Sequence, residues 1–375
     1  MDEPQFIFVC CQRGAEKVCK AELEAAHPEL RLAFSRPGFL TFKLTAKWPK
    51  NFVLRSTFAR TSGWSIGRVT NSESVTLVEE ALQLIDPIDF DQLHVWERDA
   101  AIPGSGGFEP FNTELAVTAA QLLSQALKQK HGRSRRPNRP AKADQTVVDV
   151  VLVEPDQWWI GWHIASSIPS RWIGGVPPLE RDDDLISRAY YKLAEAVEWS
   201  QFPLRRGDLV IELGSAPGGA TEFLLEQGTE VVAVDPADLD PEIAKHPKVL
   251  HLKMRSKDVS KKELAGARWL IADLNVAPNY TLDTVNDFVN NKHLHLRGLI
   301  LTLKLTHWEL ADELEACRKR VKEWGFDVVK TRQLAFNRQE ICLIALRDRI
   351  DLRGSKKRPP KRAKKNAKSS KKKEL

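Results

Sequence analysis

Four charged side chains that lie far apart in the sequence have the types needed for acid–base chemistry on a hydroxyl group. Lys304 is the only charged residue in the apolar run Leu299–Leu305, and Asp273 ends an earlier apolar run. Burial and a second ammonium, which Lys192 could provide with Asp273 between the two lysines, would lower the pKa of Lys304 toward that of a useful base. Glu340 could orient Lys192 or a ribose. Singly, Lys192 and Glu340 are more typical of surface residues, so the prediction depends on all four as an ordered set.

A glycine-rich turn between these residues predicts a cofactor site. The apolar residues 209–211 lead into the string E-L-G-S-A-P-G-G at 212–219, where we expect a helix to begin. Small residues let the backbone approach a ligand, and the first turn of a helix has free N–H groups. Asp235 follows Gly214 by 21 positions, the offset of a carboxylate that binds ribose hydroxyls. The alternative is an ordinary strand-to-helix turn.

The string lacks the G-x-G-x-x-G of a dinucleotide site and favours S-adenosylmethionine over NAD. The residues that we expect to bind this cofactor are Ser187, Gly214, Ala216, Pro217, Gly218, Gly219, Asp235 and Asp273. No cysteine or histidine spacing indicates a metal site, so we expect none.

The elements that must position these residues alternate between strand and helix from residue 180 onward. Strands are predicted at 209–214, 230–235, 248–253, 268–274, 298–305, 327–334 and 340–347, and helices at 185–199, 217–227, 281–293 and 308–324. This alternation predicts an α/β fold with a mostly parallel seven-stranded sheet covered on both faces. The five residues Ala335–Gln339 are too few for a parallel crossover, so the last strand should be antiparallel.

The first half of the chain has a different texture. A strand at 5–11, a helix at 15–26 and a strand at 39–43 predict a ferredoxin-like α+β domain over residues 1–70. A second domain at 71–175 should hold a strand at 92–98, a helix at 112–130 and a hairpin of 147–153 with 158–164. In that hairpin, alternation places Trp158 and Trp162 on the core side and leaves Trp159 as the better candidate for stacking on RNA bases.

The net charge of +7 is unevenly distributed along the 375 residues. Residues 355–375 contribute +10, and the rest of the chain carries −3. Residues 128–142 contain seven basic side chains and no acid, namely Lys128, Lys130, Arg133, Arg135, Arg136, Arg139 and Lys142. We therefore expect the loop and a disordered basic tail at 349–375 to contact RNA phosphates; a merely solubilising tail is the alternative.

Composition excludes several classes of protein. Hydrophobic content of 42% and charged content of 29% are ordinary for a globular chain. No apolar segment is long enough to cross a bilayer, and the N-terminus lacks the basic region of a signal peptide. Five cysteines without metal-ligand spacing indicate reduced, structural thiols and a cytoplasmic location, with no membrane partner.

The motifs together resemble those of the FtsJ-type ribose 2′-O-methyltransferases. The resemblance covers residues 180–347 and is carried by Ser187–Lys192, Glu212–Gly219, Asp273–Asn279, Leu303–Leu305 and Arg338–Glu340. It implies a class I, Rossmann-like methyltransferase domain at 180–348 and a Lys-Asp-Lys-Glu catalytic tetrad on Lys192, Asp273, Lys304 and Glu340. In that tetrad Lys304 is the base, Asp273 and Lys192 tune and position it, and Glu340 supports them.

The layout of the N-terminal half resembles a ferredoxin-like unit followed by a THUMP-like RNA-binding domain at 71–175. The implied substrate is RNA, a cytidine of the large-subunit (23S) rRNA. Two departures stand out: Arg255 occupies the place of the family's usual acid near the adenine, where Asp258 could substitute, and the basic tail is not part of the family pattern.

Two rivals remain open at this stage. The first is a THUMP-linked base methyltransferase, which would need an Asn/Asp-Pro-Pro-Tyr/Phe string after the fourth strand. This chain reads D-L-N-V-A-P-N-Y at 273–280, which does not match. A C5-pyrimidine methyltransferase would need a nucleophilic cysteine at the same place, and none is present there. The second rival is a non-catalytic RNA-binding protein with a vestigial cofactor pocket, against which the complete tetrad argues.

Overall fold

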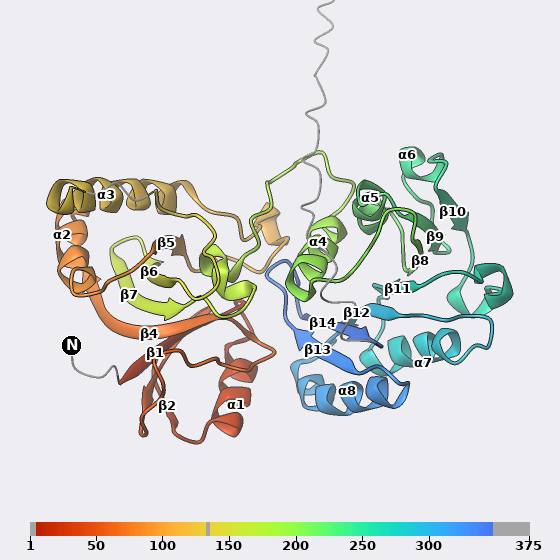
Figure 1. Ribbon diagram of the computed structural model, residues 1–375, viewed down its shortest axis with the longest axis horizontal. Helices are drawn as coiled ribbons and strands as arrows, with labels where there is room; N and C mark the ends of the chain where they lie inside the picture. The colour runs from red at the N-terminus through yellow and green to blue at the C-terminus, as the bar shows by residue number, and fades with distance from the viewer. Residues whose placement is uncertain (1–4, 133–135, 348–375) are drawn as a thin grey trace, which may run out of the picture.

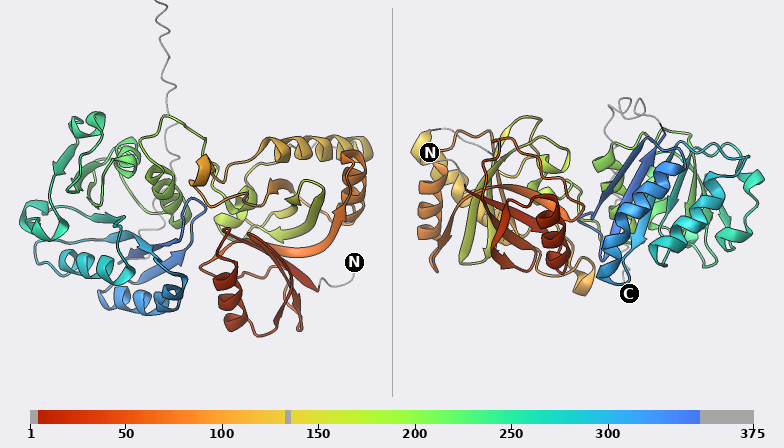
Figure 2. Two further views of the ribbon diagram at one scale, coloured as in Figure 1. Left: turned by 180° about the vertical axis from the view of Figure 1, so that it is seen from behind. Right: turned by 90° about the horizontal axis from the view of Figure 1, so that it is seen from below.

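The computed structural model describes residues 5–132 and 136–347, so the predicted tail at 349–375 and residues 133–135 of the basic loop lie outside the described residues. Two seven-stranded sheets occupy two lobes that lie side by side (Figure 1). The N-terminal lobe contains the first sheet and the C-terminal lobe the second. Views from behind and from below show that the lobes meet over a narrow region (Figure 2).

The N-terminal sheet is mostly antiparallel. Its strands, in spatial order, are β2 (Leu30–Arg36), β3 (Phe39–Leu44), β1 (Phe6–Cys11), β4 (Ala59–Thr70), β7 (Gln157–Ile164), β6 (Thr146–Glu154) and β5 (Gln92–Glu97). The pair β5–β6 is parallel, and the other neighbours are antiparallel. The helices of this lobe are α1 (Glu16–Ala26), α2 (Ser74–Ile85) and α3 (Glu114–His131).

One continuous sheet crosses the boundary that the sequence predicted between residues 70 and 71. The long strand β4 pairs with β1 on one side and with β7 on the other. The predicted hairpin of β6 and β7 is confirmed. Strand β2 and helix α2 were not predicted. The division into a ferredoxin-like and a THUMP-like domain stays a prediction.

The C-terminal sheet is mostly parallel. Its strands, in spatial order, are β10 (Val249–Leu252), β9 (Glu230–Val234), β8 (Leu209–Leu213), β11 (Trp269–Ala272), β12 (Gly298–Lys304), β14 (Glu340–Leu346) and β13 (Val328–Arg332). The first five are parallel to one another, and β14 is antiparallel to both neighbours. The mostly parallel sheet and the antiparallel last strand are therefore confirmed.

Helices cover both faces of this sheet, as its apolar strands require. The helices are α4 (Ala189–Ser200), α5 (Gly219–Glu226), α6 (Pro241–Ala244), α7 (Pro278–Val289) and α8 (Leu314–Glu323). Side chains alternate across the sheet, so Val210 packs in the cluster that includes α4, α5 and α6, whereas Ile211 packs in the cluster that includes α7 and α8. Short 3₁₀ turns lie at Ser105–Gly107, Pro169–Arg171, Ile173–Gly175, Ser256–Asp258, Lys261–Leu264 and Trp308–Glu313.

The hairpin tryptophans are all buried, which corrects one expectation. Trp158 and Trp162 lie in the core as predicted, with 3% and 9% of their surface exposed. Trp159 is also only 9% exposed, because its ring packs against Phe34 and Phe39 on the other face of the sheet, and its indole N–H donates to Ser65. Trp159 is therefore a core residue and cannot stack on RNA as predicted.

Within the described ranges, no helix has the length and apolar character needed to cross a membrane. All five cysteines are buried free thiols. Cys10 and Cys11 point to opposite faces of β1, and each is buried because both faces are covered.

Candidate active site

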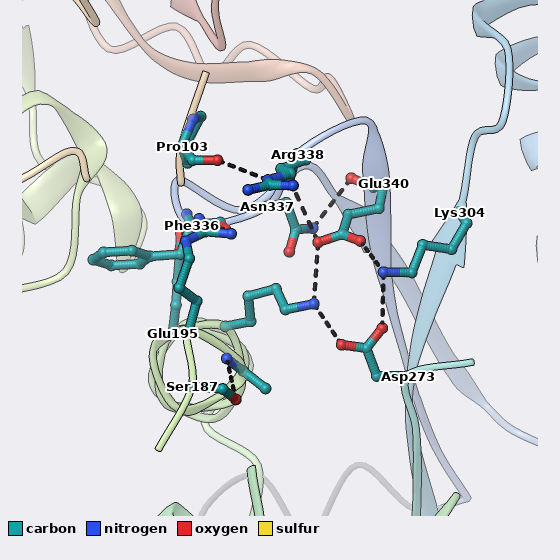
Figure 3. Close-up of polar contacts among 12 residues, drawn as sticks. Pro103, Ser187, Glu195, Asp273, Lys304, Phe336, Asn337, Arg338 and Glu340 are labelled. Carbon is teal, nitrogen blue, oxygen red and sulfur yellow. Dashed lines mark hydrogen bonds and ion pairs between the residues drawn. The ribbon is translucent and has the colours of Figure 1, made fainter. Parts of the chain in front are cut away.

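Lys192, Asp273, Lys304 and Glu340 form a closed ring of alternating charges (Figure 3). The ammonium of Lys304 lies 2.6 Å from Glu340 Oε2 and 3.2 Å from Asp273 Oδ1. The ammonium of Lys192 bonds Asp273 Oδ2 and lies 3.2 Å from Glu340 Oε1. Each lysine thus contacts both carboxylates, and each carboxylate contacts both lysines.

The fold brings the four together at the carboxyl edge of the parallel strands. Asp273 directly follows β11, and Lys304 is the last residue of β12. Glu340 is the first residue of the antiparallel β14, so the ladder places it opposite Lys304. Lys192 reaches the same point from α4. In open α/β sheets, this edge is where ligands bind.

The carboxylates decide the protonation of Lys304. Burial alone would lower the pKa of this lysine, but the charges of Asp273 and Glu340 outweigh it, and the net pKa is raised above that of an ordinary lysine. For Asp273, burial would raise the pKa, yet Lys192 and Lys304 hold it below its usual value. The expectation of a lowered Lys304 pKa is therefore wrong for this state of the protein, in which Lys304 is an ammonium.

The glycine-rich turn packs directly against the ring. Gly214 has φ +78°, and a Cβ there would lie 2.5 Å from the carbonyl oxygen of Asp273. Gly218 also has a positive φ, +122°, immediately before α5 begins. Both positions favour glycine because an L side chain is strained there. The turn can therefore approach the residue that anchors the ring only because it has no side chain at Gly214.

The other residues predicted to bind the cofactor lie around the same turn. A Cβ on Gly219 would be 2.2 Å from Ser187 Oγ, so the chain before α4 lies against the start of α5. The carboxylate of Asp235 accepts the N–H of Ala216 at 3.1 Å. Pro217 lies within the turn, and its carbonyl accepts the N–H of Asp240. The structure thus brings together all eight predicted cofactor residues.

Two observations test whether this turn fits a nucleoside cofactor. The hydroxyl of Ser215 is buried, and within the described part of the chain it has no hydrogen-bond partner. The carboxylate of Asp235 still has lone pairs, since a carboxylate can accept about four hydrogen bonds and Asp235 uses two, from Ala216 and Ala237. An unused hydroxyl, an incompletely used carboxylate and a turn without side chains fit a ligand that carries ribose hydroxyls.

Glu212 is part of the glycine-rich motif, and the sequence alone predicts no role for it. Its side chain is buried under the turn, where it accepts the Thr221 hydroxyl at 2.7 Å. Burial raises the pKa of Glu212 to about 8, although the bond from Thr221 opposes this, and the nearby charges of Asp273 and Asp235 add to the increase. Glu212 is consequently protonated at neutral pH, which limits the negative charge beneath the turn.

The site has neighbours that sequence reasoning missed. Asn337 lies in the connection between β13 and β14, where its side-chain amide donates to the backbone carbonyl of Glu340 at 3.1 Å. The backbone N–H of Arg338 points to Glu340 Oε1 at 3.4 Å. The sequence does contain a signal for these neighbours. Only five residues, 335–339, separate the last two predicted strands, so Asn337 and Arg338 must lie close to the start of β14.

Part of the predicted basic loop is built onto the N-terminal sheet. Asn138 pairs with both backbone groups of Val95 on the edge strand β5, with bonds of 2.7 and 2.9 Å. Arg136, Arg139 and Lys142 are exposed around this anchor, as is Lys128 on α3. Lys130 is partly neutralised, because it pairs with Asp86 at the end of α2. Arg133 and Arg135 lie outside the described residues.

Arg255 and Asp258 follow β10 and are both exposed. The substitution of Asp258 for the adenine-side acid stays a prediction. In the part of the chain that the structure describes, no group of three or more His, Cys, Asp or Glu side chains is placed to hold a metal ion.

Comparison with known proteins shows what the C-terminal lobe is similar to. The FtsJ-like methyltransferase family model matches residues 185–363. Curated relatives named ribosomal RNA large subunit methyltransferase M include those of Hahella chejuensis (29% identical; 46% of each chain covered) and Saccharophagus degradans (30% identical; 54% of this chain and 59% of the relative). The chain spans about half the length of these relatives.

A relative of the same name from Thauera aminoaromatica is 24% identical and is matched over 88% of this chain and 93% of its own length. Among solved structures, TrmN from Thermus thermophilus has a TM-score of 0.33 at 13% identity and covers 91% of this chain and 99% of its own. The fibrillarin pre-rRNA processing protein of Methanococcus jannaschii has a TM-score of 0.35 at 12% identity, over 58% and 85%. These scores are too low to establish a shared fold.

The similarity to this family rests instead on the sequence match. The FtsJ-like family uses S-adenosylmethionine, which the turn at 214–219 and Asp235 fit. The match covers the turn, the sheet edge and all four members of the charged ring. Residues 185–363 of this chain therefore match the FtsJ-like methyltransferase family in sequence.

Proposed function

We propose that this protein is an S-adenosylmethionine-dependent rRNA 2′-O-ribose methyltransferase that acts in the cytoplasm on a cytidine of 23S rRNA. The observation that carries the proposal is the closed Lys192–Asp273–Lys304–Glu340 ring beside the glycine-rich turn. A surface ion pair would not need four residues from four separate elements, and such pairs contribute little to stability. The ring is placed instead where a ligand at the sheet edge would meet it.

S-adenosylmethionine supplies, when bound, an electrophilic methyl group on a positively charged sulfur. The residues that would hold it are Ser187, Gly214, Ala216, Pro217, Gly218, Gly219, Asp235 and Asp273. The cofactor's sulfur would keep the carbon–sulfur bonding electrons when the methyl group passes to the ribose 2′ oxygen. Lys304, once it is a neutral amine, takes the proton of that 2′-hydroxyl on Nζ.

The other members of the ring control when Lys304 can act. As an ammonium, Lys304 is held by both carboxylates and has no lone pair. Lys192 competes for the same two carboxylates and so limits the stabilisation of the Lys304 charge. Asp273 and Glu340 fix the position of Lys304 from opposite sides, which is the orientation that a base requires.

The substrate is inferred from relatives and from charge. The relatives are named for methylation of large-subunit ribosomal RNA, and the cytidine comes from the family resemblance. The exposed basic residues Arg136, Arg139 and Lys142 lie on a part of the N-terminal lobe that is anchored to β5. Such a surface can hold phosphates in a fixed orientation.

Mapping of 2′-O-methyl groups in cellular rRNA tests this proposal. Cells with the gene should carry one 2′-O-methylcytidine in 23S rRNA that is absent after deletion and restored by the wild-type gene but not by Lys304→Met. Methionine is a matched control because it keeps the length of the side chain without the amine. An unchanged map after deletion, or loss of a base methyl group in place of a ribose methyl group, would overturn the proposal.

A further inference from the structure

Glu340 is held by a connection that contacts the N-terminal lobe. The connection between β13 and β14 consists of residues 333–339 and belongs to the C-terminal lobe. Its polar groups nevertheless bond to segments of the N-terminal lobe. The backbone N–H of Gln333 donates to Thr57 at 2.7 Å, just before β4 begins. Figure 3 shows Pro103, Arg338, Asn337 and Glu340 in succession toward the ring.

Gln12 is the first of these contacts. It follows β1, is 4% exposed, and its side-chain amide donates to the carbonyl of Asn337. Its Oε1 accepts from Gln333 Nε2 at 2.8 Å, and Gln333 Nε2 also donates to the carbonyl of Arg338 at 3.0 Å. One buried side chain from the N-terminal lobe therefore holds both sides of the turn that leads into Glu340.

The second contact is made by the turn at Pro103–Gly104. Arg338 donates from Nε to the carbonyl of Pro103 at 3.0 Å and from Nη2 to that of Gly104 at 3.1 Å. A Cβ on Gly104 would lie 2.6 Å from Arg338 Nη2, so the close approach depends on glycine. The backbone N–H of the same arginine points to Glu340 Oε1, which links the turn directly to the ring.

The C-terminal lobe fixes both ends of this connection, and at the far end the N–H of Leu305, after β12, donates to the carbonyl of Gln339 at 2.9 Å. Glu195 on α4 accepts the N–H groups of Ala335 and Phe336 at 2.9 and 3.1 Å. Beyond Phe336, the carbonyl of Asn337 and the side chain of Arg338 bond to the N-terminal lobe. The middle of the connection, at Asn337 and Arg338, is therefore held in part from outside the methyltransferase domain.

We propose that the N-terminal lobe positions the catalytic ring, with Gln12 and the 103–104 turn as positioning elements that hold Glu340 against Lys304 and Lys192. The positioning role rests on the proposed function only in so far as it is measured through the rate of methyl transfer. It assigns to the N-terminal lobe a role in the chemical step, in addition to any contact with RNA.

Release of this support has a direct electrostatic consequence. Four charged groups face one another here: Lys192 from α4, Asp273 after β11, Lys304 from β12 and Glu340 from β14. If Glu340 withdraws, Lys304 loses one of the two carboxylates that raise its pKa. A larger fraction of Lys304 is then neutral at low pH. Once Lys304 is fully deprotonated, however, methyl transfer is slower than in the wild type because the base is less well positioned.

Single-turnover methyl transfer to 23S rRNA, measured against pH at saturating cofactor and RNA, tests the proposal. The variants are Gln12→Met, which keeps the length but makes neither bond, Gln12→Glu, which keeps only the acceptor, and the exposed Arg338→Ala. Thr331→Val is the matched control, because it removes the hydroxyl bond between Thr331 and Thr57 across the same interface (3.1 Å) and leaves the backbone carbonyl of Thr57, which Gln333 bonds, in place. Melting temperature and S-adenosylmethionine affinity are measured in parallel.

The variants should lose about 10- to 100-fold in rate at alkaline pH, with a smaller deficit at low pH and unchanged cofactor affinity. Thr331→Val should match the wild type at every pH. A deficit that is the same at all pH values, or wild-type rates in the Gln12 variants, would overturn the positioning role. An inactive wild type would instead count against the proposed function. If the Gln12 variants do not fold, Arg338→Ala decides by the same criteria.

Discussion

Lys304 is bound by two carboxylates, so its use as a base requires the loss of a proton from a stabilised ammonium. Its raised pKa predicts a rate that increases with pH. We expect the single-turnover rate to rise about tenfold per pH unit from about pH 6.5 to 9. Lys304→Arg should be inactive throughout, because a guanidinium does not deprotonate in this range. A bell-shaped profile centred near neutrality would indicate that another group is the base.

The buried Glu212 makes a separate prediction about stability. Its folded pKa, about 8, is higher than the 4.5 of an exposed glutamate, so the folded state binds more protons between these values. The contribution of Glu212 to stability is therefore present at low pH and is lost as the pH rises from about 4.5 through about 8. Glu212→Gln, which is neutral at all pH values, should flatten this decline.

Urea denaturation at several pH values between pH 5 and 9 measures the effect. The difference between wild type and Glu212→Gln in the free energy of unfolding should change over this range by an amount on the order of a few kcal/mol, in favour of the variant at high pH. The exposed Glu79→Gln, on α2, is the control and should show no such change. Parallel pH curves for wild type and Glu212→Gln would show that Glu212 is not protonated in the folded state.

At the scale of residues, the sequence predicted which side chains meet but not how they titrate. Lys304 and Asp273 were recognisable because each interrupts or ends an apolar run at a strand end. The direction of the Lys304 pKa was wrong because it depends on the distances to two carboxylates, which sequence order does not supply. Gln12 was missed for the same reason, since its partners lie more than 300 positions away.

The strand-turn-helix element β8–α5 makes a prediction about binding. Gly218→Val would place a β-branched side chain at φ +122°, where such residues are strained, and 3.2 Å from Ile243. Asp235→Ala would remove the acceptor for Ala216 N–H. Each variant should weaken S-adenosylmethionine binding by about 10-fold or more, Gly218→Val through backbone strain of about 1–3 kcal/mol and Asp235→Ala through the loss of a hydrogen-bonding carboxylate.

Calorimetric titration measures these affinities, and residual methyl transfer at saturating cofactor should stay near the wild-type rate. Gly207→Ala, at a positive-φ turn on the opposite end of β8 with open space around it, controls for backbone strain alone. Unchanged affinity in both Gly218→Val and Asp235→Ala would place the cofactor elsewhere.

At the scale of elements, apolar sequence patterns predicted the buried strands correctly but did not predict the strand at an exposed sheet edge. The five parallel strands of the second sheet are short apolar runs, and all were predicted near their observed bounds. Strand β2 was missed because it lies at the sheet edge and only Leu30 is buried, which leaves no apolar pattern. Helix α2 does carry a helical period at its buried positions 77, 78, 81, 82 and 85, which is a signal that predicts a helix.

At the scale of the whole molecule, we expect RNA contacts to be divided between the basic loop on the N-terminal lobe and the basic tail. Arg136, Arg139 and Lys142 are exposed on a segment anchored to β5, so they can orient RNA. Changing all three to glutamine should weaken RNA binding, reduce the salt slope of that binding by up to about 2, and lower turnover even at saturating RNA. Glutamines at the exposed Lys319, Lys322 and Lys330 are the charge-matched control. Equal effects of both triple variants would mean that the loop has no specific role.

The tail at 355–375, with its charge of +10, should behave differently from the loop. Phosphate contacts add affinity without reading sequence, so its deletion should weaken RNA binding, reduce the salt dependence and leave the modified nucleotide unchanged. The loss should be visible in kcat/KM at low RNA concentration and disappear at saturation. A change in which nucleotide is methylated would contradict this division of roles.

The two-lobed arrangement is the part of the molecule that the sequence predicted least. The chain was divided at residue 70, whereas β4 joins both segments in one sheet. The ties between Gln12 and the 333–339 connection join the two ends of the chain, which no local pattern can indicate. They make the whole chain, and not residues 185–363 alone, the unit to use in assays.

Nucleoside analysis of 23S rRNA after incubation with the full-length protein and methyl-labelled S-adenosylmethionine tests the central claim most directly. With wild-type protein, the label should be in 2′-O-methylcytidine, and the internucleotide bond next to it should resist alkaline hydrolysis. With Lys304→Met, no label should enter the RNA while cofactor affinity stays within about a few-fold of wild type. Label in a methylated base, or equal labelling by Lys304→Met, would contradict the assignment of the ring as a ribose 2′-O-methylation site.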